Sequence, residues 1–416
     1  MKIIYAEVVT IGDEILYGHI TDTNSKWISE ELDKIGIKTI RKSSVGDQKK
    51  EILNILDESL QRADIVLITG GLGPTKDDIT KKTLAEYFSD ELVINPHAEE
   101  FVRNFFEKRG RPFTELNRQQ AAIPSKCTYL HNATGTAPGM WFDYNGKVIV
   151  SMPGVPLEMK YLINNEVIAR LKSKFELPEI VHKIVRTIGL GESFLAERIE
   201  SWEDNLPEHI KLAYLPSFGE VKLRLTGIGE NRTNIEAQIE AEINKLVPLI
   251  EEHIYSFEND EIEKSIGNIL NETKSTLGVA ESCTGGYLSH LLTSIPGSSS
   301  YFMGGVVSYS NQAKMDVLKV KQETLTKFGA VSEPTVIEMA EGVLNLMKTT
   351  YGIATSGIAG PDGGTEDKPV GTVWLAVTNG KQTLTKKLSL GKIRIVNIEY
   401  SAKAALNFLR ILTKGK

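Results

Sequence analysis

The sequence predicts an α/β protein built from three successive domains. In the first part of the chain, short apolar runs alternate with segments whose apolar residues recur at helical spacing, which is typical of βαβ units around a parallel sheet. The middle part instead has the order strand, helix, strand, strand, helix, which fits a small α+β module. The last part returns to strands that end in glycine turns and lead into helices. We expect the domains at 1–172, 175–255 and 258–416.

The composition excludes several classes of protein. The 416 residues are 41% hydrophobic and 25% charged, which is ordinary for a water-soluble globular chain, and the net charge of −6 argues against a large nucleic-acid surface. Two cysteines, Cys127 and Cys283, cannot form a disulfide framework. The N-terminus has no secretory apolar segment, and no apolar run reaches the length of a membrane span. We expect a cytoplasmic protein with no membrane partner.

The first domain has strands whose ends are marked by glycine and acidic residues. We expect strands at 3–12, 38–45, 64–69 and 147–151, and helices at 24–35, 50–62, 79–88 and 157–173. Gly-Asp-Glu at 12–14, Asp47 and the glycine-rich segment 70–78 each follow a strand. Because ligands of parallel sheets bind beyond the carboxyl ends of the strands, we expect these three segments to converge.

Carboxylates beside a glycine loop suit a divalent metal that is bound together with substrate phosphates. Glycine also lets the backbone approach a phosphate closely. An alternative is that acidic residues merely stabilise helix N-termini; we accept it for Asp22 and Asp64, but not for the Asp77–Asp78 pair after the glycines. The candidate residues are Asp47, Gly70, Gly71, Gly73 and Thr75 for the substrate, and Asp77, Asp78 and Glu158 for the metal.

Six motifs of this domain have a recognisable form. They are Gly-Asp-Glu-Ile-Leu at 12–16, Asp-Thr-Asn at 22–24, Val-Gly-Asp at 45–47, Thr-Gly-Gly-Leu-Gly-Pro-Thr-Lys-Asp-Asp at 69–78, Asn-Ala-Thr-Gly-Thr-Ala-Pro-Gly at 132–139 and Pro-Gly-Val-Pro-Leu-Glu-Met at 153–159. Together they resemble the molybdopterin-binding fold and, more narrowly, the N-terminal domain of CinA proteins. The resemblance implies an ADP-ribose pyrophosphatase that forms AMP and ribose 5-phosphate with a divalent metal of the magnesium or cobalt type. Because fold does not fix function, a non-catalytic pterin or nucleotide binder stays open.

The middle domain is expected to place its neighbours and to do no chemistry. We expect strands at 181–188, 210–216 and 220–228 and helices at 193–201 and 232–250. This order resembles that of RNA-binding KH domains. However, a basic Gly-x-x-Gly loop between helices is missing, and Gly-Leu-Gly-Glu at 189–192 has the wrong charge to clamp a phosphate. We therefore favour a spacer over an RNA-binding adaptor and expect no nucleic-acid partner.

The third domain is organised around the segment 278–286. An apolar strand at 276–280 runs into Glu-Ser-Cys-Thr-Gly-Gly, and a helix follows at 287–294. This geometry places the hydroxyl of Ser282 beside the free backbone N–H groups of Thr284, Gly285 and Gly286, where an attacked carbonyl could be held as an oxyanion. The alternative is a simple capped turn with Ser282 or Thr284 as the helix N-cap. The remaining elements are expected as helices at 260–274, 311–319, 333–348 and 394–412 and strands at 302–310, 351–356, 370–378 and 382–389.

Three further segments can complete a site around Ser282. Tyr309 and Lys314 lie five residues apart where a strand becomes a helix, so they can approach one another. Serine, lysine and tyrosine without an obvious histidine suggest a serine nucleophile that is activated by a neutral lysine, although each alone could be an ordinary surface or strand residue. The glycine loop at 355–364 offers N–H groups to an anion, and a cation at 391–394 could meet a phosphate. The candidate substrate-binding residues here are Thr284, Gly285, Gly286, Gly357, Gly360, Gly363, Gly364 and Arg394.

Long motifs of this domain also have a recognisable form. They are Ala-Glu-Ser-Cys-Thr-Gly-Gly at 280–286, Ser-Tyr-Ser-Asn-Gln-Ala-Lys at 308–314, Gly-Ala-Val-Ser-Glu-Pro at 329–334, Ser-Gly-Ile-Ala-Gly-Pro-Asp-Gly-Gly at 356–364 and Lys-Pro-Val-Gly-Thr-Val-Trp at 368–374. They resemble the nicotinamide mononucleotide deamidase domain of the CinA family. The resemblance implies hydrolysis of the nicotinamide amide without a cofactor, with Ser282 as nucleophile beside Tyr309 and Lys314. The family's late arginine corresponds to Arg394, although Gly-Lys-Ile-Arg departs from the usual local pattern. For an enzyme of this size we expect a homodimer.

Overall fold

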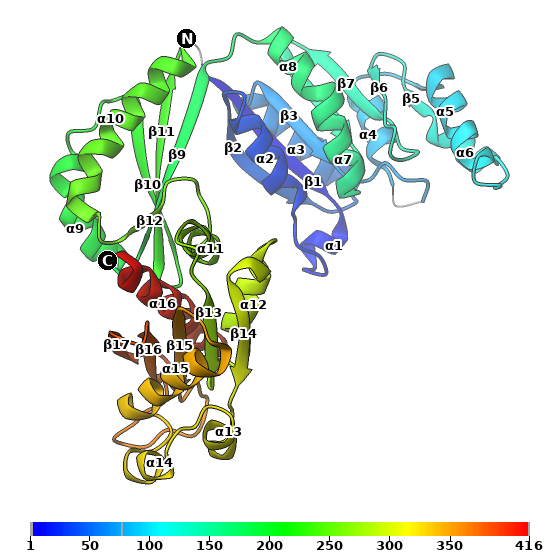
Figure 1. Cartoon of the computed structure of the whole chain (residues 1–416). Helices are drawn as coiled ribbons and strands as arrows, with labels where there is room; N and C mark the ends of the chain where they lie inside the picture. The colour runs from blue at the N-terminus through cyan, green and yellow to red at the C-terminus, as the bar shows by residue number, and fades with distance from the viewer. Residues whose placement is uncertain (1–2, 76–77, 415–416) are drawn as a thin grey trace. The chain divides into compact units, whose positions relative to one another are not determined.

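The computed structural model describes residues 3–75 and 78–414. It consists of two compact units, one formed by Met1–Val181 with Ile228–Ile235 and the other by His182–Gly227 with Glu236–Lys416 (Figure 1). Most of the middle module therefore belongs with the C-terminal domain. Within the described ranges, every helix is too short or too polar to cross a membrane.

The first unit is built around a six-stranded sheet in the order β2-β1-β3-β8-β7-β6. Its strands are β1 (Ile4–Ile11), β2 (Ile37–Val45), β3 (Ile65–Thr69), β6 (Thr128–Leu130), β7 (Gly139–Tyr144) and β8 (Lys147–Met152). The first four in this order run parallel, which confirms the predicted parallel sheet, whereas the pairings of β7 with β8 and with β6 are both antiparallel. All five residues of β3 are buried, because this central strand is covered on both faces.

Helices cover both faces of this sheet. The apolar residues of α2 (Asn24–Asp33), α7 (Pro156–Leu162) and α8 (Ile168–Lys174) form one core cluster, and those of α3 (Lys49–Arg62) and α4 (Thr80–Tyr87) form another. The helix expected at 157–173 is interrupted by a π-helical turn, Ile163–Val167. The unit also contains elements that were not predicted from the sequence. They are α1 (Asp13–Leu16), α5 (Pro96–Glu107), α6 (Glu115–Gln120) and the β4–β5 pair (Leu92–Ile94, Ala122–Pro124).

The middle module has one strand more than expected. Its sheet has the order β10-β11-β9-β12, and its elements are β9 (Glu179–Ile188), α9 (Glu192–Glu203), β10 (Ile210–Ser217), β11 (Glu220–Gly229), α10 (Arg232–Ile250) and β12 (Ile254–Ser256). The additional strand, β12, has only three residues, so its sequence shows no period of its own. It pairs antiparallel with β9.

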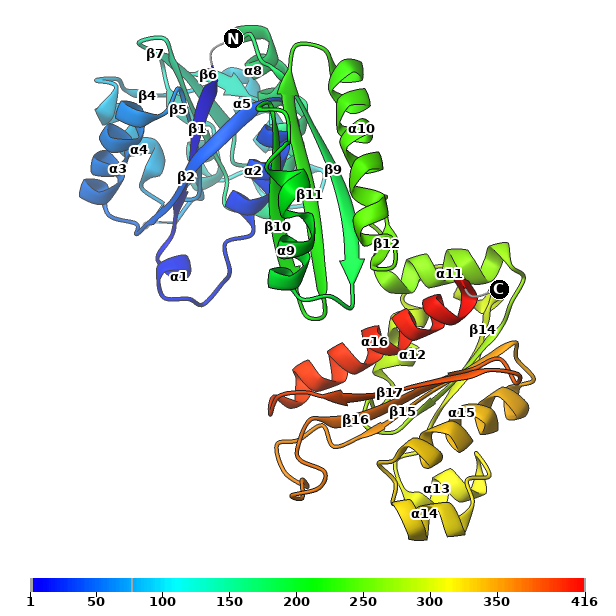
Figure 2. The same ribbon diagram turned by 90° about the vertical axis from the view of Figure 1, so that its left-hand side faces the viewer.

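The C-terminal domain is a three-layer structure around the sheet β14-β13-β15-β16-β17. The strands are β13 (Leu277–Glu281), β14 (Phe302–Val307), β15 (Tyr351–Gly357), β16 (Thr372–Thr378) and β17 (Thr383–Ser389); β13 is parallel to both of its neighbours, and the other two pairings are antiparallel. The helices are α11 (Ile262–Glu272), α12 (Tyr287–Thr293), α13 (Asn311–Asp316), α14 (Gln322–Phe328), α15 (Glu333–Met347) and α16 (Arg394–Lys414). Figure 2 shows α16 on one face of the sheet and α15 on the other, in agreement with two separate core clusters.

A charged network joins the middle module to the C-terminal domain within the second unit. The guanidinium of Arg186 on β9 donates to Glu261, just before α11, at 2.5 and 2.7 Å and to the hydroxyl of Tyr255 at 2.9 Å. Tyr255 in turn donates to Glu220 on β11, which also accepts from Lys403 on α16. Because Arg186 and Glu220 are buried, separating the two parts would leave their charges without these partners.

Candidate active sites

Ser282 lies directly beyond the central parallel strand of the C-terminal sheet. All five residues of β13 are buried, and the strand ends at Glu281. The N–H of Ser282 donates to the carbonyl of Thr355 on β15 at 2.9 Å, which fixes the serine backbone at the strand ends. The chain then turns through Gly285 and Gly286, whose φ angles of +61° and +100° favour glycine. The strand–turn–helix geometry expected from the sequence is present.

The structure brings Lys314 to Ser282. The Lys314 Nζ lies 3.0 Å from Ser282 Oγ and donates to the carbonyl of Ser308 at 2.7 Å. The lysine residue is only 1% exposed, and this burial lowers its pKa below the ordinary lysine value. A lysine of lowered pKa can lose its proton and then accept the proton of a serine hydroxyl.

Tyr309 contacts Arg394 and not Lys314. Its hydroxyl accepts from Arg394 Nη2 at 3.1 Å, while Arg394 Nη1 donates to the carbonyl of Gly360 at 2.8 Å. Both side chains line the same cavity, but Lys314 is buried, while Tyr309 remains 63% exposed and bonds to Arg394 instead of to the lysine.

A cavity of about 300 Å³ joins these groups. Among the predicted residues, its lining includes Ser282, Tyr309, Lys314, Gly357, Gly360, Gly363 and Arg394. Thr284, Gly285, Gly286 and Gly364 stand outside this lining. The sequence analysis missed Cys283, Ala330, Val331, Ser356 and Asp362, which also line the cavity. Ser356 at least could have been suspected, because it is the first residue of the predicted glycine motif.

The carboxylate of Glu281 occupies backbone donors that were expected to hold an oxyanion. It accepts from the N–H groups of Gly286, Leu288 and Ser289 at 3.0, 3.1 and 2.8 Å. The N–H of Gly285 donates to the carbonyl of Ser282 at 3.2 Å. The expectation that the amides of Gly285 and Gly286 face an oxyanion is therefore wrong, because both already have acceptors within the chain.

The capped-turn alternative is also corrected, since the N-cap of α12 is Gly286 and the capping carboxylate belongs to Glu281. The hydroxyl of Thr284 pairs with that of Thr355 at 2.7 Å. In the part of the chain that the structure describes, the backbone amides of Cys283 and Thr284 donate to no other residue. Cys283 lines the cavity and Thr284 directly follows it in the chain, so these two amides are the candidates for an oxyanion site beside Ser282.

The glycine loop after β15 is packed tightly and held by the start of α16. A Cβ atom on Gly357 would lie 2.6 Å from Val373 Cγ2, and one on Gly360 would lie 2.6 Å from Val370 Cγ1. Asn397 Nδ2 donates to the carbonyls of Ala359 and Gly391 at 2.9 and 2.8 Å. Side chains would not fit at these glycines, so the loop backbone itself forms the cavity wall.

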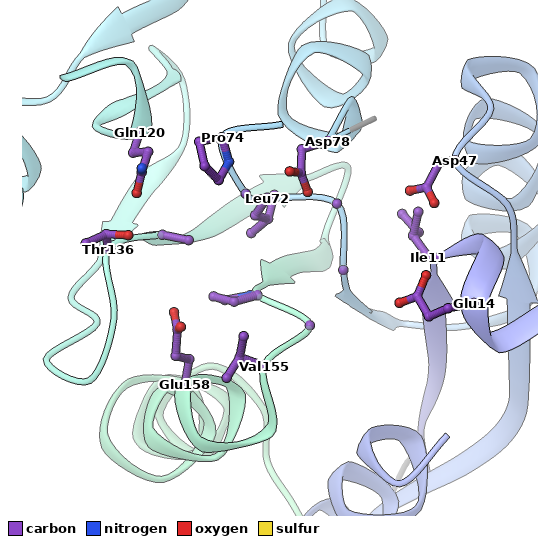
Figure 3. A pocket seen from close by; sticks show the side chains of 17 residues that line it. Ile11, Glu14, Asp47, Leu72, Pro74, Asp78, Gln120, Thr136, Val155 and Glu158 are labelled. Atoms are coloured by element: carbon purple, nitrogen blue, oxygen red, sulfur yellow. The ribbon is translucent and has the colours of Figure 1, made fainter. Parts of the chain in front are cut away.

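A second cavity, of about 510 Å³, lies at the strand ends of the first unit (Figure 3). Of the predicted residues, Asp47, Gly70, Gly71, Gly73, Asp78 and Glu158 line it, together with Gly12 and Glu14. The predicted convergence of the strand-end segments is therefore present. Thr75 stands outside the lining, but its N–H donates to Asp78 at 2.9 Å and its hydroxyl also contacts that carboxylate. Asp77 lies outside the described residues.

Glu158 approaches this cavity from the opposite side to Glu14 and Asp47 (Figure 3). Burial raises the pKa of Glu158, and this outweighs the opposing hydrogen bond from Asn132 Nδ2 at 2.6 Å. A Cβ atom on Gly135 would lie 2.1 Å from the Glu158 carboxyl carbon, so the carboxyl group fills a space that only glycine leaves open. A carboxyl of raised pKa retains a proton more readily and so suits proton transfer better than metal binding.

The remaining carboxylates fit a metal only in part. Within residues 3–75 and 78–414, no group of three or more histidine, cysteine or acidic side chains is placed to hold a metal ion. Magnesium is commonly held by one or two carboxylates together with substrate phosphates, and Asp47 and Asp78 on the cavity wall could supply that number.

Lys81 was not identified from the sequence. It is buried in α4 and donates to the carbonyl of Gln120 at 3.1 Å, and Gln120 lines the cavity. Burial lowers the pKa of Lys81 to about 8, although the charge of Asp78 opposes this shift. A lysine one turn into a predicted helix gives no sequence signal of such burial.

Comparisons with known proteins show which families the successive parts of the chain are similar to. Family models match residues 7–173 ("Probable molybdopterin binding domain"), 182–256 ("Damage-inducible protein CinA KH domain") and 259–413 ("CinA C-terminal domain"). The chain is 54% identical to a CinA-like protein of Cytophaga hutchinsonii over 98% of this chain and 97% of that one. It is 48% identical to a CinA-like protein of Flavobacterium psychrophilum over 97% of each.

The competence/damage inducible protein CihA of Agrobacterium tumefaciens, a crystal structure, is 38% identical over 36% of this chain and 93% of its own, with a TM-score of 0.36. The family assignment depends on the two full-length relatives, whose identity extends through all three matched segments. The chain belongs to the CinA family.

Proposed function

We propose that the C-terminal domain hydrolyses the carboxamide of nicotinamide mononucleotide to give nicotinate mononucleotide and ammonia. The observation that best supports this proposal is the 3.0 Å contact between Ser282 Oγ and the Nζ of the buried Lys314 on the wall of a cavity. Such a pair supplies a nucleophile and a base without a histidine.

In the proposed reaction, neutral Lys314 takes the proton of Ser282 while Oγ attacks the carboxamide carbon. The amides of Cys283 and Thr284 stabilise the oxyanion, as the N–H after the nucleophile does in other serine hydrolases. Lys314 then returns the proton to the departing nitrogen, so that ammonia leaves and an acyl ester remains on Ser282. A water molecule, deprotonated by Lys314, hydrolyses the ester and restores the serine.

The nucleotide phosphate is proposed to bind near the Gly357–Gly364 loop with Arg394. Arg394 is held by Gly360 and Tyr309, so its position does not depend on the substrate alone. This assigns Tyr309 to positioning Arg394 and leaves the proton relay to Lys314.

The test measures ammonia and nicotinate mononucleotide from purified full-length protein and its Ser282→Ala variant. We expect turnover by the wild type and its loss in the variant, with a covalent acyl-enzyme detected by intact mass spectrometry in the wild type or in Ser282→Cys. In a competing mechanism Ser282 only positions the substrate and Lys314 activates water directly. Near-wild-type turnover by Ser282→Ala would support that competing mechanism.

We further propose that the N-terminal domain hydrolyses ADP-ribose to AMP and ribose 5-phosphate with a divalent metal of the magnesium or cobalt type. Support comes from a cavity whose wall combines glycine backbone with Asp47, Asp78 and Glu158. Asp47 and Asp78, with Asp77, would hold the metal, which would neutralise the charge of the pyrophosphate. Glu158, whose pKa is raised by burial, would donate a proton to the departing phosphate.

Incubation with ADP-ribose, with and without EDTA, tests this second activity. Release of AMP that EDTA abolishes is the expected result. The competing function is a non-catalytic pterin or nucleotide binder, since the fold alone does not fix function. Binding of ADP-ribose without hydrolysis at any metal concentration would establish that function instead.

The middle module is proposed to be a spacer, and the protein a cytoplasmic homodimer without nucleic-acid or membrane partners. The charged network between Arg186, Glu261 and Glu220 supports the spacer role, since it attaches the module to the C-terminal domain. Salt-dependent binding of RNA would contradict it, and light scattering would determine the oligomeric state.

A further inference from the structure

Glu281 is a buried charged residue that the proposed reaction does not use. It is the last residue of β13, is 0% exposed, and directly precedes Ser282. An ionised carboxylate in such a position is costly unless several donors surround it. The donors around the Glu281 carboxylate therefore indicate the role of this residue.

Four donors converge on the two oxygens of the Glu281 carboxylate. They are the backbone N–H groups of Gly286, Leu288 and Ser289 and the hydroxyl of Ser289, the last at 2.6 Å. These groups belong to the first turn of α12 and its N-cap, where the helix dipole also favours a negative charge. The Glu281 carboxylate thus holds the turn 282–286 against the end of β13, where the turn begins.

The backbone of Glu281 is tied to the other half of the Ser–Lys pair. Its carbonyl accepts from the N–H of Ser308 at 2.8 Å and from the Ser308 hydroxyl at 3.4 Å. The carbonyl of Ser308 is the group that accepts from Lys314 Nζ at 2.7 Å. One residue therefore fixes the turn that presents Ser282 and, through Ser308, the strand end that directs Lys314.

We propose that Glu281 is a positioning residue for the Ser282–Lys314 pair. Its carboxylate draws the amides of Gly286, Leu288 and Ser289 away from the cavity and holds the turn, which leaves the amides of Cys283 and Thr284 beside Ser282 Oγ. The inference rests on the proposed amidase function for its substrate, but the geometry of the serine can be tested without that substrate.

The test compares Glu281→Gln with wild-type full-length protein. Glutamine keeps the shape, but its amide nitrogen faces backbone N–H groups that need an acceptor. We expect kcat for nicotinamide mononucleotide to fall about 100-fold, the scale of losing one oxyanion donor, while KM changes less than about threefold. Labelling of Ser282 by a fluorophosphonate, followed by intact mass spectrometry, should slow to a similar extent.

Two further variants keep the inference falsifiable. Ser289→Ala removes the shortest bond to the carboxylate and should lower both kcat and the labelling rate about threefold to tenfold, even if Glu281→Gln does not fold. Glu263→Gln is the matched control, because Glu263 is also a buried glutamate of this domain, on α11, and should leave both rates unchanged. Wild-type kcat and labelling in a folded Glu281→Gln, or in Ser289→Ala where Glu281→Gln is unfolded, would overturn the inference.

The labelling experiment separates the two proposals. If the wild type does not deamidate nicotinamide mononucleotide, the proposed function fails. A slower labelling of Ser282 in Glu281→Gln would still support the positioning role, and unchanged labelling would overturn it.

Discussion

The two cavities of this chain lie at equivalent places in their sheets but differ in which side chains on their walls contact one another. Each lies beyond the carboxyl ends of central parallel strands, where glycines bring the backbone close to the cavity. In the C-terminal cavity the functional groups contact one another, as Ser282 contacts Lys314 and Tyr309 contacts Arg394. In the N-terminal cavity Asp78 and Glu158 are bonded to their own neighbours, Thr75 and Asn132.

This difference shows that topology fixes where a site lies, while side-chain contacts determine whether it is complete. The C-terminal cavity already pairs Ser282 with Lys314, the proposed nucleophile and base. In the function proposed for the N-terminal cavity, the carboxylates act together only through an added cation and the substrate phosphates.

Lys314→Met is expected to lower kcat/KM for nicotinamide mononucleotide at least about 1,000-fold, because the nucleophile loses its base. Turnover of ADP-ribose should not change, since that cavity lies in the other compact unit. Lys321→Met, an exposed lysine after the same helix, serves as the control and should retain both activities. Retained deamidation in Lys314→Met would show that another group is the base.

Asp78→Asn is expected to lower ADP-ribose hydrolysis about 100-fold while deamidation stays at the wild-type rate. The change removes a charge from the cavity wall and weakens any cation bound there. Glu107→Gln, an exposed acid of α5, is the matched control. Equal loss of both activities in Asp78→Asn would contradict two independent sites.

The sequence predicted the location of both cavities better than their internal contacts. Strand and helix periods, together with glycines such as Gly70 and Gly285, indicate where strands end and turns begin. The approach of Lys314 to Ser282 depends on which way a side chain turns after β14, and that is a tertiary property. The same limit explains why the sequence did not predict the hydrogen bond between Tyr309 and Arg394.

Buried charges were the other part that the sequence pattern could not show. Glu281 follows an apolar strand and looks like an exposed end residue until its four donors are seen. Lys81 sits in a helix where lysine is ordinary, yet it is buried. The burial of both side chains depends on partners in the adjoining turn or in a neighbouring loop. The local spacing of apolar residues carries no information about such partners.

The rate of deamidation in the C-terminal cavity is expected to depend on the protonation of Lys314. Burial lowers the pKa of Lys314, so its neutral, active form appears at a pH below the ordinary lysine pKa of 10.5. The rate should therefore rise with pH through a single step below 10.5. Unfolded lysine holds its proton more tightly than the buried one, so Lys314 should also make the protein more stable as pH rises between these two pKa values. A rate that falls over this range would contradict a neutral lysine base.

The smallest expected effect concerns Tyr309→Phe, which tests whether the tyrosine acts through Arg394. The change removes one hydrogen bond to a guanidinium, and such a bond contributes about 1.5–3 kcal/mol at most and less at this exposed position. We therefore expect KM for nicotinamide mononucleotide to rise about threefold, with kcat nearly unchanged, because Arg394 keeps its bond to Gly360. Tyr351→Phe, a buried tyrosine on β15, controls for general loosening of the sheet. If kcat instead falls by about 100-fold at constant KM, the phenol takes part in proton transfer beside Lys314, and the C-terminal cavity contains a three-residue site rather than a pair.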